Sequence, residues 1–382
     1  MRNADAFTAM NADSCSQASR RSRQFIARLC ASFVVVFAAL LAPYTAHAVR
    51  PHSAHAAPYT FAVISGALTK PADESVAQRL IEAIGRAPGL SFVVYDGNLK
   101  GRHEACTDDL YGRRHAILAA ARIPLVFVPG QRDWTNCTST SSVSIDPLER
   151  LDQLRNTFFP NGSSLGLRTL RLTRESEVSR FQPYRENTRW QAGQTVFVTL
   201  NVPGDNNHYL AAGGRNGEFE DRAVANAFWL EHAGAYATQH NARAMVIFIE
   251  ANPFGKLSQH AERFAWLRQF GRHQPRDGYR EFRHNLMKLA QTFHGPIVLL
   301  HASDESLAHG FLIDQPLRNE RGRKMANVTR IAFSLHAPLA QWLQIDANAA
   351  RRPFLKVSVR NVPKSLPSAA ASFATPSSQA QP

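Results

Sequence analysis

Apolar runs that alternate with helix-like segments constrain the fold of this chain more than any other feature. Residues 59–64 read as a strand, and residues 73–87 carry apolar side chains at helical spacing. A strand at 90–95, a helix at 108–121 and a strand at 123–128 follow in turn. This order predicts parallel strands joined by crossover helices.

The second half of the chain continues the alternation. Asp146 and Pro147 begin a helix within residues 145–160 as N-cap and first-turn residues. The other elements expected there are strands at 196–202, 244–249, 296–300, 329–333, 342–346 and 355–359, and helices at 222–236 and 278–293. We therefore expect one α/β domain over residues 59–362 that contains two packed sheets, rather than two domains.

Polar clusters follow four of the strands. They are Ser65-Gly66-Ala67-Leu68, Asp96-Gly97-Asn98, Gly130-Gln131-Arg132-Asp133-Trp134 and His301-Ala302-Ser303-Asp304-Glu305. In open α/β sheets, ligands bind at the carboxyl ends of the strands. These clusters are therefore where a functional site is expected.

The first 48 residues read as an export signal. Four arginines between residues 20 and 28 precede an apolar stretch at 29–42, and Ala46-His47-Ala48 gives a small-x-small cleavage site. The apolar stretch is shorter than the ~20 residues that span a bilayer, so cleavage is favoured over a retained N-terminal membrane anchor, which is the alternative. We expect a periplasmic or secreted protein, with a linker at 49–58 and a disordered tail at 363–382, uncharged from residue 366 onward.

Cysteine usage agrees with export. Cys15 and Cys30 fall in the leader, so Cys106 and Cys137 alone remain after cleavage. Two cysteines in an oxidising compartment most simply form one disulfide, and the alternative is a metal site in which His103 joins both thiols.

The chain is basic, with 44 Lys and Arg against 30 Asp and Glu and a formal net charge of +14. Removal of residues 1–48 leaves 39 basic and 28 acidic residues, so the charge stays strongly positive. Such a charge favours an anionic envelope ligand, a phosphate-containing small molecule or a phospholipid surface, and ordinary solubility is the plainer explanation. No basic stripe is interleaved with aromatic residues, so nucleic-acid binding is not expected.

Several segments resemble the calcineurin-like metallophosphoesterase superfamily, and most closely an exported bacterial branch of it. The segments are Phe61-Ala62-Val63-Ile64, Asp96-Gly97-Asn98-Leu99-Lys100-Gly101, Pro129-Gly130-Gln131-Arg132-Asp133-Trp134, Asn201-Val202-Pro203-Gly204-Asp205-Asn206-Asn207, His301-Ala302-Ser303-Asp304-Glu305 and Ile313-Asp314-Gln315-Pro316-Leu317. The resemblance extends from about residue 59 to about residue 360. It implies a metallophosphoesterase-like four-layer α/β sandwich, two mixed sheets flanked by helices, and counterparts for both Cys106 and Cys137.

The metal-binding motifs of that superfamily are degenerate here. Gly66 and Leu68 stand where the family has Asp and His, and Asn98 replaces a carboxylate that bridges two metals. Gln131 and Arg132 replace a metal ligand and the catalytic His, whereas Asp133 keeps its acidic position. The terminal Gly-His-x-His motif becomes Ala302-Ser303-Asp304-Glu305, and Glu250-Ala251-Asn252 follows the strand where another His is expected.

These replacements predict that two metal ions do not bind. A dinuclear centre concentrates about four positive charges within ~4 Å and needs anionic and imidazole ligands. Arg132 adds a fixed positive charge instead, and we expect Asp304 or Glu305 to pair with it. The leading interpretation is an exported pseudoenzyme with a binding or structural role and no cofactor.

Two alternatives remain open. In the first, Asp96, Asn98, Asp133, His301 and Glu305 hold one divalent metal (Mn, Fe, Zn or Ca), and the protein is a phosphoric-ester hydrolase. In the second, the positive charge makes it a peripheral membrane-surface protein. A Walker loop and a dinucleotide fingerprint are both missing from the sequence.

Overall fold

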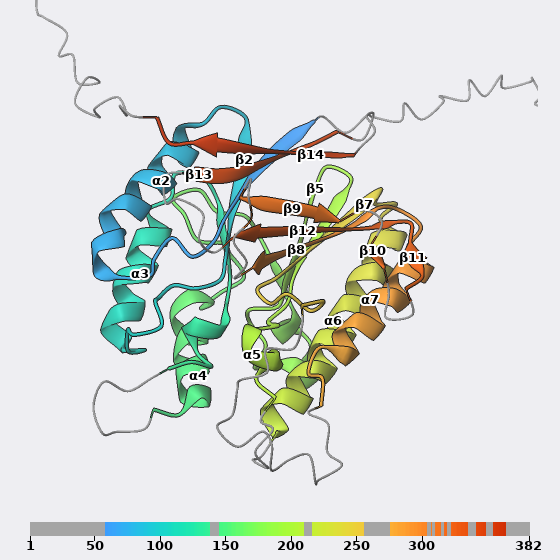
Figure 1. Cartoon of the computed structure of the whole chain (residues 1–382), viewed down its shortest axis with the longest axis horizontal. Coiled ribbons are helices and arrows are strands. Elements are labelled where there is room, and N and C mark those ends of the chain that lie inside the picture. Colours follow the sequence, from blue (N-terminus) through green and yellow to red (C-terminus); the bar gives the residue numbers. More distant parts are fainter. Residues whose placement is uncertain are drawn as a thin grey trace, which may run out of the picture. The chain divides into compact units, whose positions relative to one another are not determined.

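The structure is a computed structural model (Figure 1). It describes residues 58–137, 145–209, 216–255, 276–303, 307, 310–314, 317–318, 322–334, 341–348 and 354–363. All of them belong to one compact unit, His55–Pro382. The predicted leader at 1–48, nearly all of the predicted linker and tail, and Asp304 and Glu305 lie outside the described residues.

The first sheet has the strand order β14-β13-β1-β2-β3. Its strands are β1 (Tyr59–Ile64), β2 (Leu90–Asp96), β3 (Leu125–Val128), β13 (Gln341–Ala347) and β14 (Leu355–Asn361). Strands β1, β2 and β3 are parallel, whereas β13 pairs antiparallel with β1 and β14. The sheet is therefore mixed, and the carboxyl ends of its three parallel strands share one edge.

The second sheet has the order β4-β5-β6-β7-β8-β12-β9. Its strands are β4 (Thr173–Arg174), β5 (Thr188–Ala192), β6 (Thr195–Thr199), β7 (Ala244–Ile249), β8 (Ile297–Ser303), β9 (Phe311–Asp314) and β12 (Val328–Ser334). Strands β6, β7, β8 and β12 are parallel, and β5 and β9 pair antiparallel with β6 and β12. A separate ribbon joins β10 (Leu317–Arg318) to β11 (Lys324–Met325).

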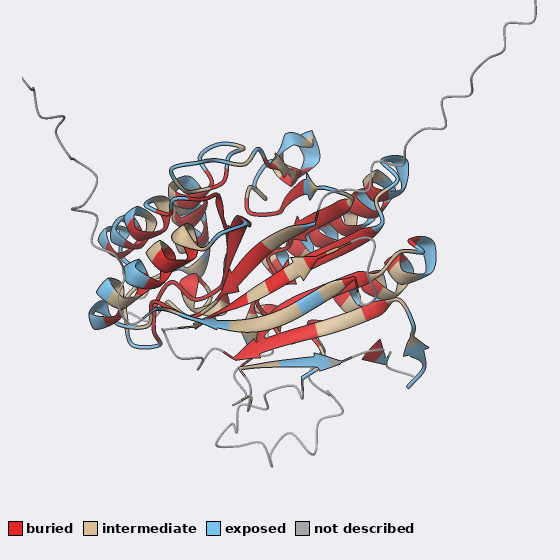
Figure 2. Ribbon diagram, turned by 90° about the horizontal axis from the view of Figure 1, so that it is seen from above, coloured by how far each residue is buried: buried red, intermediate tan, exposed pale blue. Residues whose placement is uncertain are grey.

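The two sheets pack face to face through alternate residues of their strands. Phe61 of β1 and Phe92 of β2 stack with ring centroids 5.2 Å apart, and Phe197 of β6 meets both rings edge-on from the second sheet. Because successive side chains of a strand point to opposite faces, Ala62 and Ile64 face the other way. Figure 2 shows that the buried residues follow these strands and the helix faces turned toward them.

Helices cover the outer faces of both sheets. Helices α2 (Glu74–Arg86), α3 (Asp108–Ala119) and α4 (Pro147–Phe158) cover the first sheet, and α6 (Gly217–Gln239) and α7 (Arg280–Thr292) cover the second (Figure 1). Asp146 caps α4 by accepting a hydrogen bond from the Leu148 amide, as the sequence predicts. The remaining short elements are α5 (Gly204–Asn207) and the 3₁₀ turns Pro71–Asp73, Gln131–Asp133, Glu175–Glu177 and Ser179–Phe181.

The predicted four-layer α/β sandwich, with two mixed sheets flanked by helices, is confirmed. Cys106 and Cys137 form the predicted disulfide, with Cα atoms 5.4 Å apart, which is consistent with export. Within the described part of the chain, no helix is both long enough and apolar enough to cross a membrane.

Candidate functional site

The carboxyl ends of β2, β3 and β7 bring three buried carboxylates to one edge of the sandwich. Asp96 ends β2, Asp133 lies in the turn after β3, and Glu250 directly follows β7. All three side chains are buried. This edge is where the sequence predicts a site, but Glu250 was not among the predicted residues.

Glu250 lies at the centre of the cluster and joins three segments. One of its oxygens, Oε1, accepts a hydrogen bond of 3.2 Å from Asn98 Nδ2. The other, Oε2, accepts bonds from the amides of Gln131 at 3.2 Å and Gly204 at 2.7 Å. The segments that follow β2, β3 and β6 are therefore all tied to one carboxylate.

The sequence of β7 explains why Glu250 points inward. Val246 and Phe248 face the other sheet, whereas Ile247 and Ile249 face the helices. Since side chains alternate along a strand, the residue two positions after Phe248 also points between the sheets.

Two glycines leave room for the Glu250 side chain. A Cβ added at Gly97 would lie 2.5 Å from Glu250 Cγ, and one added at Gly130 would lie 2.8 Å from the same atom. The glutamate therefore occupies the space above both glycine backbones, and either substitution would displace it.

Asp133 is held by the backbone. Its carboxylate accepts hydrogen bonds from the amides of Asn98 at 3.1 Å, Leu99 at 2.5 Å and Gly130 at 2.7 Å. Burial raises the pKa of Asp133 to about 6, although these amide donors act in the opposite direction. The carboxylate holds the loop after β2 against the turn after β3, which is a structural task.

Asn98 connects the two acids. Its backbone has a φ of +61°, in the left-handed region that asparagine tolerates better than most residues. Its Oδ1 accepts a hydrogen bond from the Arg132 amide at 3.1 Å, while its Nδ2 donates to Glu250. A neutral amide can do both, because it carries a donor and an acceptor.

Asp96 differs from the other two acids. Neither of its carboxylate oxygens has a hydrogen-bond partner among the described residues. Burial, with a smaller contribution from the neighbouring Glu250, raises the pKa of Asp96 well above its ordinary value. The same two kinds of effect, burial first and then the charge of Asp133, raise the pKa of Glu250 to about 7. The cluster therefore carries fewer than three full negative charges at neutral pH.

Gln131 and Arg132 line the partly exposed side of the cluster. The Gln131 side chain packs so closely against Gly204 that an added Cβ there would collide with Gln131 Oε1. The Arg132 amide is bonded to Asn98. The predicted pairing of Arg132 with Asp304 or Glu305 cannot be placed, because both acids lie outside the described residues.

His301 lies on the other face of the second sheet. Its neighbour Ala302 faces the first sheet, and His301 pairs in register with Ile249, which faces the helices. Burial lowers the pKa of His301 to about 3, so the ring is neutral, and Nδ1 lies 2.6 Å from the Ala302 carbonyl oxygen. The structure therefore brings together Asp96, Asn98, Gln131, Arg132 and Asp133, and it turns His301 away from them.

A left-handed turn borders the cluster. Asp205, Asn206, Asn207 and His208 have φ values between +54° and +58°. Arg222 of α6 stabilises the turn by donating to Asn207 Oδ1 at 2.5 Å and to the Asn207 carbonyl oxygen at 3.0 Å. A left-handed backbone conformation costs about 1–2 kcal/mol per non-glycine residue, and it persists only where surrounding contacts stabilise it.

The donor set does not fit a dinuclear metal centre. Across the described ranges, no group of three or more His, Cys, Asp or Glu side chains is placed to hold a metal ion. The oxygens of Asp133 and Glu250 already accept six bonds from protein N–H groups. These bonds would compete with a metal ion for the same lone pairs.

Fold and site together define an α/β sandwich protein in which Asp133 and Glu250, two of the strand-end acids, are bonded to the protein itself. No family model matches the chain. No curated protein matches it either.

Solved structures that match include purple acid phosphatase PPD1 from yellow lupin (Lupinus luteus) seeds. The identity is 11%, the match covers 80% of this chain and 52% of that one, and the TM-score is 0.41. Another is GAP50, the anchor in the inner membrane complex of Plasmodium, with 10% identity, 80% and 85% coverage and a TM-score of 0.42. This chain spans about half the length of the lupin phosphatase that it matches.

Proposed function

We propose that this chain is an exported, non-catalytic protein of metallophosphoesterase-like fold that acts by binding rather than by hydrolysis. The observation that carries the proposal is the position of Glu250, whose carboxylate joins Asn98, Gln131 and Gly204 at the strand ends. A hydrogen-bonded glutamate there holds the loops together without an ion.

The protonation of the cluster supports this proposal. A catalytic metal site needs ionised carboxylates, which the metal charge would stabilise. Here burial raises the pKa of Asp96 well above its ordinary value and that of Glu250 to about 7, so Asp96 holds a proton at neutral pH and Glu250 holds one part of the time, whereas Asp133, raised to about 6, is mostly ionised. A cluster with this reduced negative charge attracts a pair of metal cations less strongly than three ionised carboxylates would.

The export part of the proposal is supported by two independent features. The leader pattern ends at Ala46-His47-Ala48, and the described chain contains the disulfide between Cys106 and Cys137. Disulfides persist in oxidising compartments such as the bacterial periplasm. Both features favour a location of the folded domain outside the cytoplasm.

One observation favours the alternative, a phosphoric-ester hydrolase with a single metal ion. Asp96 keeps two buried oxygens without hydrogen-bond partners among the described residues. A cation next to Asp96 would satisfy them, but His301 faces the helix side and could not join it. Among the described members of the cluster, Asp96 alone has carboxylate oxygens without hydrogen bonds, which is a poor donor set for a metal ion, so we give this alternative second place.

The experiment is metal analysis and assay of the processed protein, residues 49–382. We expect less than stoichiometric Mn, Fe, Zn and Ca, and no turnover of a generic phosphodiester when Mn²⁺ is added. Asp96→Asn tests the alternative, and Asp205→Asn, which changes an exposed acid in the neighbouring turn, is the matched control. Stoichiometric metal and turnover that Asp96→Asn abolishes, but Asp205→Asn leaves, would refute the non-catalytic proposal.

A further inference from the structure

The amino-terminal edge of the second sheet carries a group of exposed basic residues. Arg243 precedes β7, and Arg318, Arg323 and Lys324 belong to the β10–β11 ribbon or adjoin it. All four are exposed. We call these four residues the basic edge. It lies at the end of the sheet opposite to the carboxylate cluster.

Strand register brings Arg243 close to the ribbon. Met245 pairs with Ile297, and Ile297 pairs with Val328. The rows at the starts of β7 and β12 are therefore two strands apart, which corresponds to about 10 Å, and Arg243 directly precedes β7 while the turn of Ala326 directly precedes β12. Lys324 is two residues from Ala326, so residues about 80 positions apart in sequence form one surface.

The ribbon is held firmly against the body of the protein. Leu317 is buried in the core beneath α7, and Met325 packs against the same core. Asn327, just after the ribbon, donates to the carbonyl oxygens of Ala290 at 3.0 Å and Phe293 at 2.9 Å. The cations therefore project from an ordered platform, which limits the entropy lost when they bind a partner.

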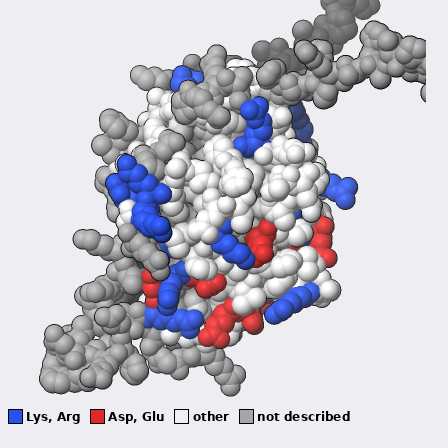
Figure 3. Space-filling view, turned by 90° about the vertical axis from the view of Figure 1, so that its right-hand side faces the viewer, with Lys and Arg blue, Asp and Glu red and all other residues white. Residues whose placement is uncertain are grey.

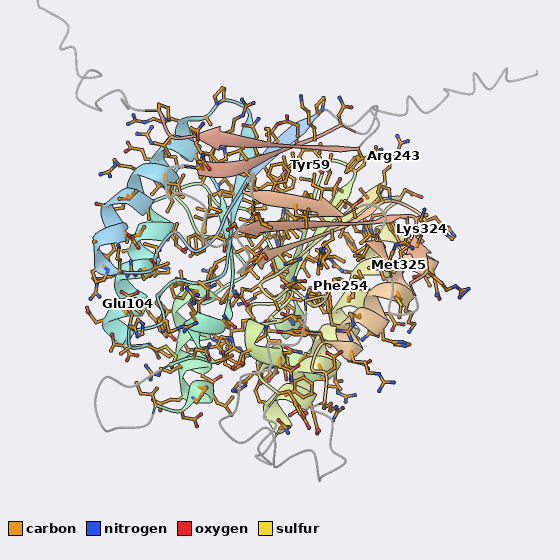
Figure 4. All side chains as sticks on the ribbon, viewed as in Figure 1. Tyr59, Glu104, Arg243, Phe254, Lys324 and Met325 are labelled. Carbon is orange, nitrogen blue, oxygen red and sulfur yellow. A yellow bond between two sulfur atoms is a disulfide. The ribbon has the colours of Figure 1, made fainter. Side chains whose placement is uncertain are left out.

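The figures place these residues on one side of the molecule. Figure 4 shows Arg243, Lys324 and Met325 together, and Glu104 on the opposite side. In Figure 3, which views this side, Lys and Arg occur over the whole face, whereas the visible Asp and Glu lie in its lower half. Among the described residues visible in this view, the upper half of the face therefore carries cations and no anions.

Exposed aliphatic side chains adjoin the basic edge. Strand β9, the outer strand of the sheet, leads into the ribbon and exposes Leu312 and Ile313 by 41% and 42%. Cationic side chains beside exposed aliphatic ones match the headgroup and upper acyl layers of a bilayer better than they match a polyanion alone.

We propose that the basic edge, with β9, docks the protein on an anionic phospholipid bilayer. This inference rests on the proposed binding function and names its partner. Arg243, Arg318, Arg323 and Lys324 contact headgroup phosphates. Leu312, which faces the same side of the sheet as the ribbon, enters the interface between headgroups and acyl chains. The carboxylate cluster, at the other end of the sheet, takes no part.

The test is co-sedimentation of residues 49–382 with vesicles of phosphatidylglycerol and phosphatidylcholine, compared with phosphatidylcholine alone. A variant with Arg243→Gln, Arg318→Gln, Arg323→Gln and Lys324→Gln removes the basic edge. Each cation near an anionic surface contributes about fivefold to partitioning, so we expect a loss of at least tenfold. The matched control carries Lys70→Gln, Arg79→Gln, Arg122→Gln and Arg168→Gln, which are exposed elsewhere, and should lose much less.

Binding of wild-type protein should also fall steeply at about 0.5 M salt, which needs no variant. An equal loss in the control variant, or no preference for phosphatidylglycerol, would overturn the proposal. So would equally tight binding to a DNA duplex of similar charge, because it would show a general polyanion surface. Failure of vesicle binding leaves the metal and turnover results unchanged, so the two proposals fail separately.

Discussion

Glu250 Oε1 lies 3.2 Å from Asn98 Nδ2, and this hydrogen bond joins two residues 152 positions apart. It connects the segment after β2 in one sheet to the segment after β7 in the other. A side-chain amide and a carboxylate thus link the two halves of the sandwich at the edge where the strands end.

Truncation of Glu250 should destabilise the protein strongly. Glu250→Ala leaves the Asn98 side chain and the Gln131 and Gly204 amides without their acceptor, and a buried donor that loses its partner costs about 1–3 kcal/mol. We expect a loss of about 3 kcal/mol or more in the free energy of unfolding, measured by urea denaturation.

Two variants control for this result. Glu250→Gln keeps the volume and one acceptor oxygen, so it should cost about half as much or less. Glu281→Ala removes an exposed glutamate at the start of α7 and should change stability by less than about 0.5 kcal/mol. Equal stability of Glu250→Ala and Glu281→Ala would contradict the central position given to Glu250.

Two glycine-to-alanine substitutions should change the free energy of unfolding in opposite directions. Gly130→Ala would place a Cβ 2.8 Å from Glu250 Cγ and 2.9 Å from the Asn98 amide nitrogen, and we expect a loss of about 1–3 kcal/mol. Gly112→Ala lies within α3, where an added Cβ meets nothing within 4 Å, and should stabilise by about 0.5–1 kcal/mol. Thermal denaturation of both variants checks the prediction, and a stable Gly130→Ala protein would disprove it.

The raised pKa of Glu250 predicts a specific pH dependence. The folded protein keeps this proton up to about pH 7, whereas the unfolded chain releases it near 4.5. Between these values the native state binds more protons, so the contribution of Glu250 to stability falls as pH rises. The lowered pKa of His301 acts oppositely between about pH 3 and 6.5, because only its unfolded form is protonated there.

The difference in the free energy of unfolding between wild type and Glu250→Gln separates the titration of Glu250 from that of His301. The stability of Glu250→Gln relative to wild type should increase from pH 4.5 to pH 7 and then level off, because the variant has no proton to lose at this position. Urea denaturation at several pH values gives this difference directly. A difference that does not change with pH would mean that Glu250 titrates normally.

Asn98→Asp should destabilise the protein most at alkaline pH. The substitution replaces the donor to Glu250 Oε1 with an acceptor and adds a further buried carboxylate to the cluster directly beside Glu250, at a cost of about 2 kcal/mol or more. Acidification should restore much of this loss, since one of the two acids then carries a proton. Asn161→Asp, at an exposed position, is the control. A pH-independent loss would show that repulsion between the two acids is not the cause.

Loss of the disulfide should weaken the domain. A bond between Cys106 and Cys137 closes a loop of 31 residues, and the chain-entropy estimate for such a loop is about 3–4 kcal/mol. Cys106→Ala/Cys137→Ala should therefore unfold at lower urea concentration, and a thiol reductant should lower the midpoint of wild type but not that of the variant. An unchanged midpoint in wild type would show that the bond does not stabilise the fold.

The sequence predicted most of the architecture because the hydrophobic pattern is strong. The bounds predicted for 59–64 and 244–249 agree with β1 and β7, and the other parallel strands differ by a few residues at their ends. Strands β5 and β9 were not predicted. Both are short, with five and four residues, and their strand character comes from antiparallel pairing with β6 and β12.

The site was predicted less completely, because the alternation of side chains between the two faces of a sheet was not applied to it. Glu250 continues the inward-facing series of Val246 and Phe248, a signal present in the sequence that was not used. His301 was grouped with Asp96 because both end a strand, but alternation places it on the helix side. The bonds of Asp133 to three amides depend on loop geometry that periodicity does not encode.

The left-handed turn Asp205–His208 limits how this segment can change. Beta-branched residues disfavour positive φ. Substitution by valine, isoleucine or threonine at any of the four positions would therefore force φ to a negative value or unfold the turn. Aspartate, asparagine and glycine are the residues that suit such a conformation. The backbone of this turn therefore restricts the side chains that these four positions accept more than their exposure does.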